Sequence, residues 1–112
     1  MRVIVTGSTC WNDEEKIRRE LIRLPIGATI LHGEEIGANA IAAKIAEELK
    51  LETELWSADW DTHGSRADKR RNQEMVDADV DLCLAFPMEA SRSTWDCVRR
   101  ARSARIETIV MK

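Results

Sequence analysis

The 112-residue sequence has no apolar run that approaches the roughly 20 residues a membrane-spanning helix needs. Met1 and Arg2 lead straight into a predicted strand, so no signal peptide is expected. Its three cysteines, Cys10, Cys83 and Cys97, are odd in number and widely spaced. That pattern argues against a disulfide framework and against a structural zinc site. We therefore expect a cytoplasmic protein with no membrane segment, no bound metal and no cofactor.

An excess of positive charge is also missing. The chain has 17 Lys and Arg against 20 Asp and Glu, which gives a net charge of −3. This balance provides no global attraction for nucleic acid or anionic lipid. Basic residues cluster between Arg66 and Arg71 and between Arg99 and Arg105, so binding to nucleic acid would have to come from one local face. A nucleic-acid partner is therefore not expected.

Repeats, low-complexity segments and linkers are absent as well, so residues 1–112 are predicted to form a single domain. Apolar or alternating runs predict strands at residues 2–6, 28–32, 53–58, 81–86 and 107–111. Helical patterns fall between them, starting at Asn12 with Glu15 as in a capping box, at residues 36–50 and 67–78, and at Ser93 as a cap. A polar loop is expected from Asp59 to about Arg66.

This alternation predicts an α/β, Rossmann-like three-layer sandwich with a five-stranded parallel sheet. The expected strand order is 3-2-1-4-5, which makes strands one and four neighbours across the point where the order reverses. Strand one ends in Thr6-Gly7-Ser8, and strand four ends at Pro87. In doubly wound folds the crevice outside such strand ends holds small ligands, usually nucleotides. Glycine at position 7 would let a ligand approach the backbone.

Other polar residues are expected around the same edge of the sheet. Ser93 and Thr94 open the last helix, and a helix N-terminus favours an anion. Arg71 lies one turn before Met75, which sets a buried stripe, so its side chain is expected to reach toward the sheet. An arginine there can make a bidentate contact with a carboxylate or phosphate. The candidate ligand-binding residues are Gly7, Ser8, Trp11, His32, Gly33, Trp60, His63, Asn72, Pro87, Arg92, Ser93 and Thr94.

Tyrosine is missing and Phe86 is the single phenylalanine, yet the chain has four tryptophans. Trp11, Trp60 and Trp95 each follow a predicted strand end or open a helix. Three aromatic rings around one rim could stack a base or form a dimer interface. Trp56 lies within a predicted strand and is expected in the core.

These pieces, in this order, resemble the YspA-type branch of the SLOG superfamily. Other members of that superfamily include the Lonely Guy cytokinin-activating phosphoribohydrolases and DprA-like proteins. The resemblance covers nearly the whole chain. The matching segments are Val3-Ile4-Val5-Thr6-Gly7-Ser8 with Trp11, Leu31-His32-Gly33 with Gly37-Ala38 and Ala42-Ala43, Ala58-Asp59-Trp60 with His63-Gly64, Arg71-Asn72 with Glu74-Met75, Leu84-Ala85-Phe86-Pro87, and Thr94 with Val98-Arg99-Arg100-Ala101.

The resemblance implies a Rossmann-like fold, a nucleotide-derived small molecule as ligand, and a homodimer. In the phosphoribohydrolase relatives an arginine and an acidic residue act at a ribosyl bond, and by similarity these fall on Arg71 and Asp96. Arg71 would orient or polarise the substrate. Asp96 would stabilise an oxocarbenium-like sugar or activate water. The implied activity is hydrolysis of an N-glycosidic bond.

Two segments depart from the pattern of the family. Residues 88–94 contain no glycine where the family has a Gly-rich phosphate loop, and Glu89 adds negative charge. Glu34 and Glu35 follow the second strand, and Asn39 stands where an aspartate is common. Because carboxylates repel phosphate, two alternatives stay open. One is a nucleotide sensor without catalysis. The other is a protein-interaction module, of phage or mobile-element origin, that docks a partner through its tryptophans.

Overall fold

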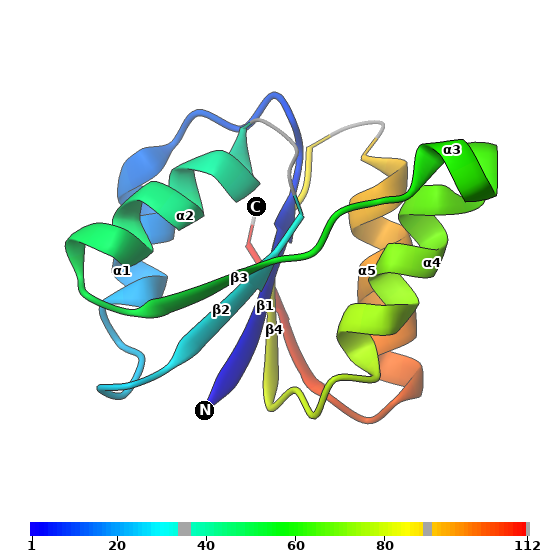
Figure 1. The fold of residues 1–112 in the computed structure, drawn as a ribbon. Helices are drawn as coiled ribbons and strands as arrows, with labels where there is room; N and C mark the ends of the chain where they lie inside the picture. The colour runs from blue at the N-terminus through cyan, green and yellow to red at the C-terminus, as the bar shows by residue number, and fades with distance from the viewer. Residues whose placement is uncertain (34–36, 89–90, 112) are drawn as a thin grey trace.

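The computed structural model describes residues 1–33, 37–88 and 91–111. Five parallel strands form one sheet in the order β3-β2-β1-β4-β5, which confirms the predicted order (Figure 1). The strands are β1 (Arg2–Gly7), β2 (Thr29–His32), β3 (Glu52–Leu55), β4 (Leu82–Phe86) and β5 (Glu107–Val110). Strand β1 lies at the centre, and its last residue, Gly7, pairs with Phe86 of β4.

Helices cover both faces of the sheet, so the predicted three-layer Rossmann-like arrangement is confirmed (Figure 1). Helices α1 (Glu14–Leu21) and α2 (Ala38–Glu48) lie on one face, and α4 (Ala67–Val76) and α5 (Arg92–Ser103) lie on the other. In the part of the chain that the structure describes, no helix is long and apolar enough to cross a membrane. The described residues also contain no group of three potential metal ligands.

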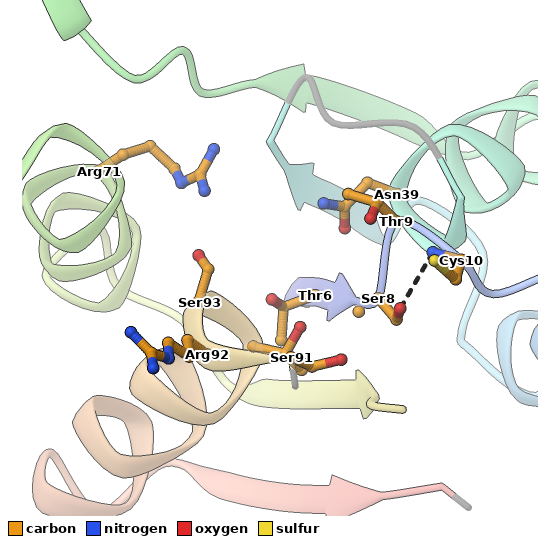
Figure 2. A pocket seen from close by; sticks show the side chains of 11 residues that line it. Thr6, Ser8, Thr9, Cys10, Asn39, Arg71, Ser91, Arg92 and Ser93 are labelled. Carbon is orange, nitrogen blue, oxygen red and sulfur yellow. Dashed lines mark hydrogen bonds between the residues drawn. The ribbon is translucent and has the colours of Figure 1, made fainter. Parts of the chain in front are cut away.

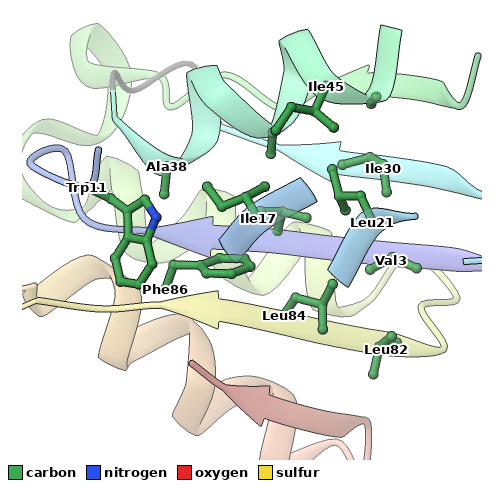
Figure 3. Close-up of a cluster of buried hydrophobic side chains, with 13 residues drawn as sticks. Val3, Trp11, Ile17, Leu21, Ile30, Ala38, Ile45, Leu82, Leu84 and Phe86 are labelled. Atoms are coloured by element: carbon green, nitrogen blue, oxygen red, sulfur yellow. The ribbon is translucent and has the colours of Figure 1, made fainter. Parts of the chain in front are cut away.

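The alternation of side chains along β1 explains why there are two cores. Val3 and Val5 belong to the cluster beneath α1 and α2, whereas Ile4 packs with residues of α4 and α5. In the first cluster the rings of Trp11 and Phe86 meet edge to face, with centroids 5.3 Å apart (Figure 3). Both faces of the central strands are therefore buried, as the continuous apolar runs in the sequence indicated.

The starts of three helical segments differ from the sequence prediction. Asp13, not Asn12, caps α1, because its Oδ1 accepts a hydrogen bond from the backbone N–H of Lys16. The expected loop after residue 59 instead contains a short helix, α3 (Trp60–His63), and a 3-10 turn (Gly64–Arg66). Helix α5 begins one residue after Ser91, so Ser93 lies inside its first turn. Neighbouring Asn, Asp and Ser residues compete for the cap position, and local sequence does not decide between them.

Candidate functional site

A pocket of about 350 Å³ opens at the carboxyl end of β1, close to where β1 and β4 end (Figure 2). Segments from both faces of the sheet contribute to it, namely the turn after β1, the first turn of α2, helix α4 and the start of α5. The described residues that line it are Thr6, Gly7, Ser8, Thr9, Cys10, Asn39, Arg71, Ser91, Arg92, Ser93 and Thr94.

Backbone hydrogen bonds hold the turn after β1 in place. The N–H of Ser8 donates to the carbonyl of Phe86, and the carbonyl of Ser8 accepts from the N–H of Ala38, both at 3.0 Å. A Cβ on Gly7 would clash with the Cβ of Ala38 and lie 2.9 Å from the carbonyl oxygen of Phe86. Glycine is therefore required here by the close packing of α2 against the two strands, in addition to any approach of a ligand.

Arg71 reaches into the pocket from α4 (Figure 2). Only 3% of the residue is exposed, and its Nε donates a hydrogen bond to Oδ1 of Asn72 at 3.1 Å. Asn72 is itself buried and uses its Nδ2 to donate to the carbonyl of Ser93 at 3.0 Å. The guanidinium is thus oriented by a side chain that links α4 to α5.

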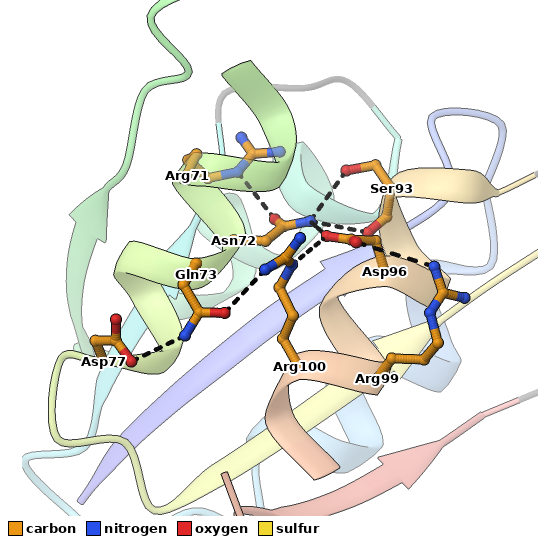
Figure 4. Close-up of polar contacts among 8 residues, drawn as sticks. All are labelled: Arg71, Asn72, Gln73, Asp77, Ser93, Asp96, Arg99 and Arg100. Carbon is orange, nitrogen blue, oxygen red and sulfur yellow. Dashed lines mark hydrogen bonds and ion pairs between the residues drawn. The ribbon is translucent and has the colours of Figure 1, made fainter. Parts of the chain in front are cut away.

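Asp96 lies behind this link and not in the pocket (Figure 4). Its Oδ2 accepts hydrogen bonds from Nδ2 of Asn72 at 3.1 Å and from Nε of Arg100 at 2.8 Å. The hydrogen bond with Asp96 raises the pKa of Arg100 above its usual value. Asp96 lines an adjoining groove of about 410 Å³, which shares Ser91 and Arg92 with the pocket. Asn72 therefore stands between the two residues that the resemblance put forward for chemistry.

The chemistry of the pocket suits an anion. Its described lining contains two arginines, several hydroxyl groups and one amide, and no Asp, Glu or His among the residues that the structure describes. The first-turn N–H groups of α5 have no acceptor within the helix and carry the positive end of the helix dipole. Positive charge and N–H donors face the same space, which favours a phosphate or carboxylate group over a metal ion.

Six of the site residues predicted from sequence line this pocket. These are Gly7, Ser8, Arg71, Arg92, Ser93 and Thr94. Thr6 and Asn39 also line it; the sequence pattern marked both but they were not among the candidate ligand-binding residues. Thr9, Cys10 and Ser91 line it as well, and no sequence pattern singled them out. Asn39 gave a usable signal, because it is a polar residue in an otherwise apolar Ala38-to-Ala43 helical segment, and it is only 4% exposed.

The remaining candidates occupy other places. Trp11 lies in the core against Phe86 and is 7% exposed, so the structure does not place it on an open rim. Trp60 belongs to α3 and is 54% exposed, with His63 in the same short helix. Trp56, which was expected in the core, is half-buried and packs against the second core cluster.

Two further candidates end the second strand, and one follows the fourth. Nδ1 of His32 lies 2.8 Å from the carbonyl of Gly33. Gly33 and Pro87 are buried. The carboxylates of Glu34, Glu35 and Glu89 lie outside the described residues, so their expected repulsion of phosphate stays a prediction.

Comparisons with known proteins show the family of the chain. The sequence profile of the YspA, cpYpsA-related SLOG family matches residues 1–63. The gene 61 protein of Mycobacterium phage D29 is 41% identical over 117 residues, an alignment that covers 96% of this chain and 94% of the phage protein. With more than half of the chain matched by the family profile, and a relative aligned along almost its full length, the protein belongs to the YspA, cpYpsA-related SLOG family.

Proposed function

We propose that the pocket binds a nucleotide or a nucleotide-derived small molecule through its phosphate. The observation that carries the proposal is the combination of Arg71 and Arg92 with the start of α5, and no carboxylate among the described lining residues. The pocket also lies outside the carboxyl ends of neighbouring parallel strands, where doubly wound folds hold nucleotides. Membership of the SLOG family supports the same ligand class.

Arg71 is assigned the main phosphate contact. Its guanidinium is buried and oriented by Asn72, so little side-chain freedom is lost when a ligand binds. A planar guanidinium can bond two phosphate oxygens at once. Hydroxyl groups of Ser8, Ser93 and Thr94 are placed to contribute further hydrogen bonds to the ligand.

The test is thermal unfolding, followed by tryptophan fluorescence, against nucleoside monophosphates, cyclic nucleotides, ADP-ribose and NAD. A ligand at about 100 times its Kd adds roughly 2.7 kcal/mol to the free energy of unfolding. We expect Arg71→Ala to remove most of the Tm shift, measured against the ligand-free Tm of the same variant. Arg19→Ala, an exposed change on α1, should keep it. No shift with any compound at millimolar concentration would overturn the proposal.

Hydrolysis of an N-glycosidic bond is a second candidate function. It is favoured by one observation, namely that Asp96 lines a groove that shares Ser91 and Arg92 with the pocket. A ligand with its phosphate in the pocket and its ribose over this shared wall would approach the carboxylate. Asp96 could then stabilise positive charge on the sugar.

Asp96→Asn separates this activity from binding. If Asp96 is catalytic, the variant should lose release of free base, measured by chromatography, while it keeps the Tm shift given by the nucleotide. If the wild-type protein binds nucleotide and releases no base from any of the compounds, the chain acts as a sensor and the hydrolase proposal fails.

A homodimer is proposed from the family resemblance together with two exposed apolar side chains. Leu55 and Trp60 are 58% and 54% exposed. Light scattering at micromolar concentration should give twice the monomer mass of 12.7 kDa. A monomer mass across the concentration range would contradict the proposal.

A further inference from the structure

Two other hollows lie near the pocket, beyond the start of α5. The pocket shares Ser91 and Arg92 with the adjoining groove, whose lining also includes Lys69, Trp95 and Arg99. That groove shares Lys69 with a third hollow of about 370 Å³. Three neighbouring hollows therefore follow one another from the strand ends over α4 and α5, and we refer to this series as the path.

The third hollow is strongly basic. The described residues that line it are Arg66, Lys69, Arg70, Gln73 and Arg100. Lys69 and Arg70 each lie three or four positions from Arg66, the N-cap of α4, and from Gln73, so the four residues share one face at the start of α4. Nη1 of Arg100 donates to Oε1 of Gln73 at 2.9 Å, which brings a cation of α5 to the same place (Figure 4). Arg100 is paired with Asp96, but the other three cations, and the lack of a carboxylate among these described residues, favour negative charge in this hollow.

The middle groove contains both signs of charge, and its acids are partly compensated. Asp68 and Asp96 line it together with Lys69, Arg92 and Arg99. Asp96 is held by Arg100 at 2.8 Å and lies 3.9 Å from Arg99. Among the described residues that line this groove, three cations face two acids, which leaves a small excess of positive charge.

The overall net charge hides this local excess. Residues 1–63 contain 7 Lys and Arg against 12 Asp and Glu, whereas residues 64–112 contain 10 against 8. The fold puts α4 and α5 side by side on one face of the sheet and α1 and α2 on the other (Figure 1). Two basic clusters that are far apart in the sequence thus meet on one side of the molecule.

We propose that this path binds a short single-stranded nucleic acid whose terminal phosphate occupies the pocket. We call it the cationic track and define it by Arg66, Lys69, Arg70, Arg92, Arg99 and Arg100. The proposal rests on the proposed function, because it extends the same phosphate site to a longer ligand. Repeated cations match repeated phosphates. The ring of Trp95 in the middle groove offers a surface on which an unstacked base can lie, as in other proteins that bind single strands.

Fluorescence anisotropy tests the track directly. The probes are labelled oligothymidylates of about six nucleotides with a phosphate at the 5′ end, at the 3′ end or at neither, an oligouridylate of the same length, and a duplex. We expect a phosphorylated single strand to bind most tightly and a duplex to bind more weakly. If about three phosphates are neutralised, the logarithm of the association constant falls with the logarithm of salt concentration with a slope of about −2.

Two double variants of equal charge change identify the surface involved. Arg66→Gln with Arg70→Gln removes two exposed cations of the track. Arg19→Gln with Arg23→Gln removes two exposed cations on and just after α1. The first pair should weaken strand binding by about tenfold and reduce the salt slope by about 1.4, whereas the second should change neither. Both should keep the Tm shift given by a mononucleotide.

The outcomes separate the track from the pocket. A mononucleotide shift without binding of any strand overturns the track and leaves the proposed function standing. Equal weakening by the two double variants shows a general charge effect and overturns the track as well. A third outcome is strand binding that changes neither with the terminal phosphate nor in Arg71→Ala, together with no Tm shift from any mononucleotide. That outcome overturns both the proposed function and the terminal-phosphate assignment. A duplex that binds as tightly as the single strand overturns the assignment to single strands.

Discussion

Two glycines illustrate how one residue type answers two different physical demands. Gly7 has no room for a Cβ, because Ala38 and the carbonyl of Phe86 already fill that space. Gly64 has open space around it, with nothing within 4 Å of a Cβ, but its φ of +54° is a conformation that L-residues rarely adopt. The first glycine is required by packing and the second by backbone geometry.

The two sites should therefore respond in opposite order to alanine and asparagine. Gly64, with ψ of −132°, has the backbone geometry of the first central position of a type II′ turn, where Gly, Asn and Asp dominate, so Gly64→Asn should cost less than Gly64→Ala, which should cost about 1–3 kcal/mol. At Gly7, asparagine is larger and should cost more than alanine, which should already cost about 1–3 kcal/mol by overpacking. Urea unfolding of the four variants measures the order. The same ranking at both sites would contradict this assignment.

At the level of elements, Arg2 ties the beginning of β1 to β3 and to the segment after α4. Its guanidinium donates two hydrogen bonds to Glu54, at 2.7 and 2.9 Å, and its Nε donates to the carbonyl of Ala78 at 2.9 Å. The hydrogen bond from Arg2 lowers the pKa of Glu54, with a smaller contribution from the indole N–H of Trp56. The carboxylate is therefore stabilised in its charged form in the folded chain.

The ion pair of Arg2 and Glu54 predicts that the free energy of unfolding depends on pH in the acid range. Because the pKa of Glu54 is lower when folded, its contribution is present above the ordinary value of 4.5 and is lost as the pH falls below it. Both side chains are about one-third exposed, so screening by solvent limits the effect to below about 1 kcal/mol. Glu54→Gln should be less stable than wild type at neutral pH, and the gap should shrink near pH 3. Glu52→Gln, exposed on the same strand, is the control. If Glu54→Gln is still less stable than wild type by the same amount near pH 3, the charge of Glu54 is not the cause of the difference.

The elements themselves were largely predictable from sequence, because apolar runs in β1 and β4 demand burial on both faces. Their boundaries were less predictable. The N-cap of α1 is Asp13 and not the predicted Asn12, since either side chain can accept the same hydrogen bond. The short helix after Asp59 was missed because a four-residue helix has no apolar period to detect.

For the whole molecule, strand order and the position of the pocket followed from the alternation of strands and helices together with the handedness of crossovers. The different roles of neighbouring residues within the site could not be predicted from this alternation. Arg71 and Asn72 are adjacent in sequence, yet the first lines the pocket and the second turns toward Asp96. That distinction depends on how α4 and α5 pack, which no local pattern contains. The packing of α4 against α5 also brings together the basic residues of 66–71 and 99–105.

The placement of the three thiols makes the molecule suited to selective chemical labelling. Cys10 is exposed and lines the pocket, whereas Cys83 and Cys97 are buried. A hydrogen bond between the two buried thiols, together with burial, raises the pKa of Cys83, so it offers little reactive thiolate. A disulfide reagent should modify one thiol of the native protein quickly and the others only on unfolding. A dye attached at Cys10 would sit at the mouth of the pocket, and a bound ligand would slow its attachment, so the chain supplies its own reporter of occupancy without an engineered cysteine.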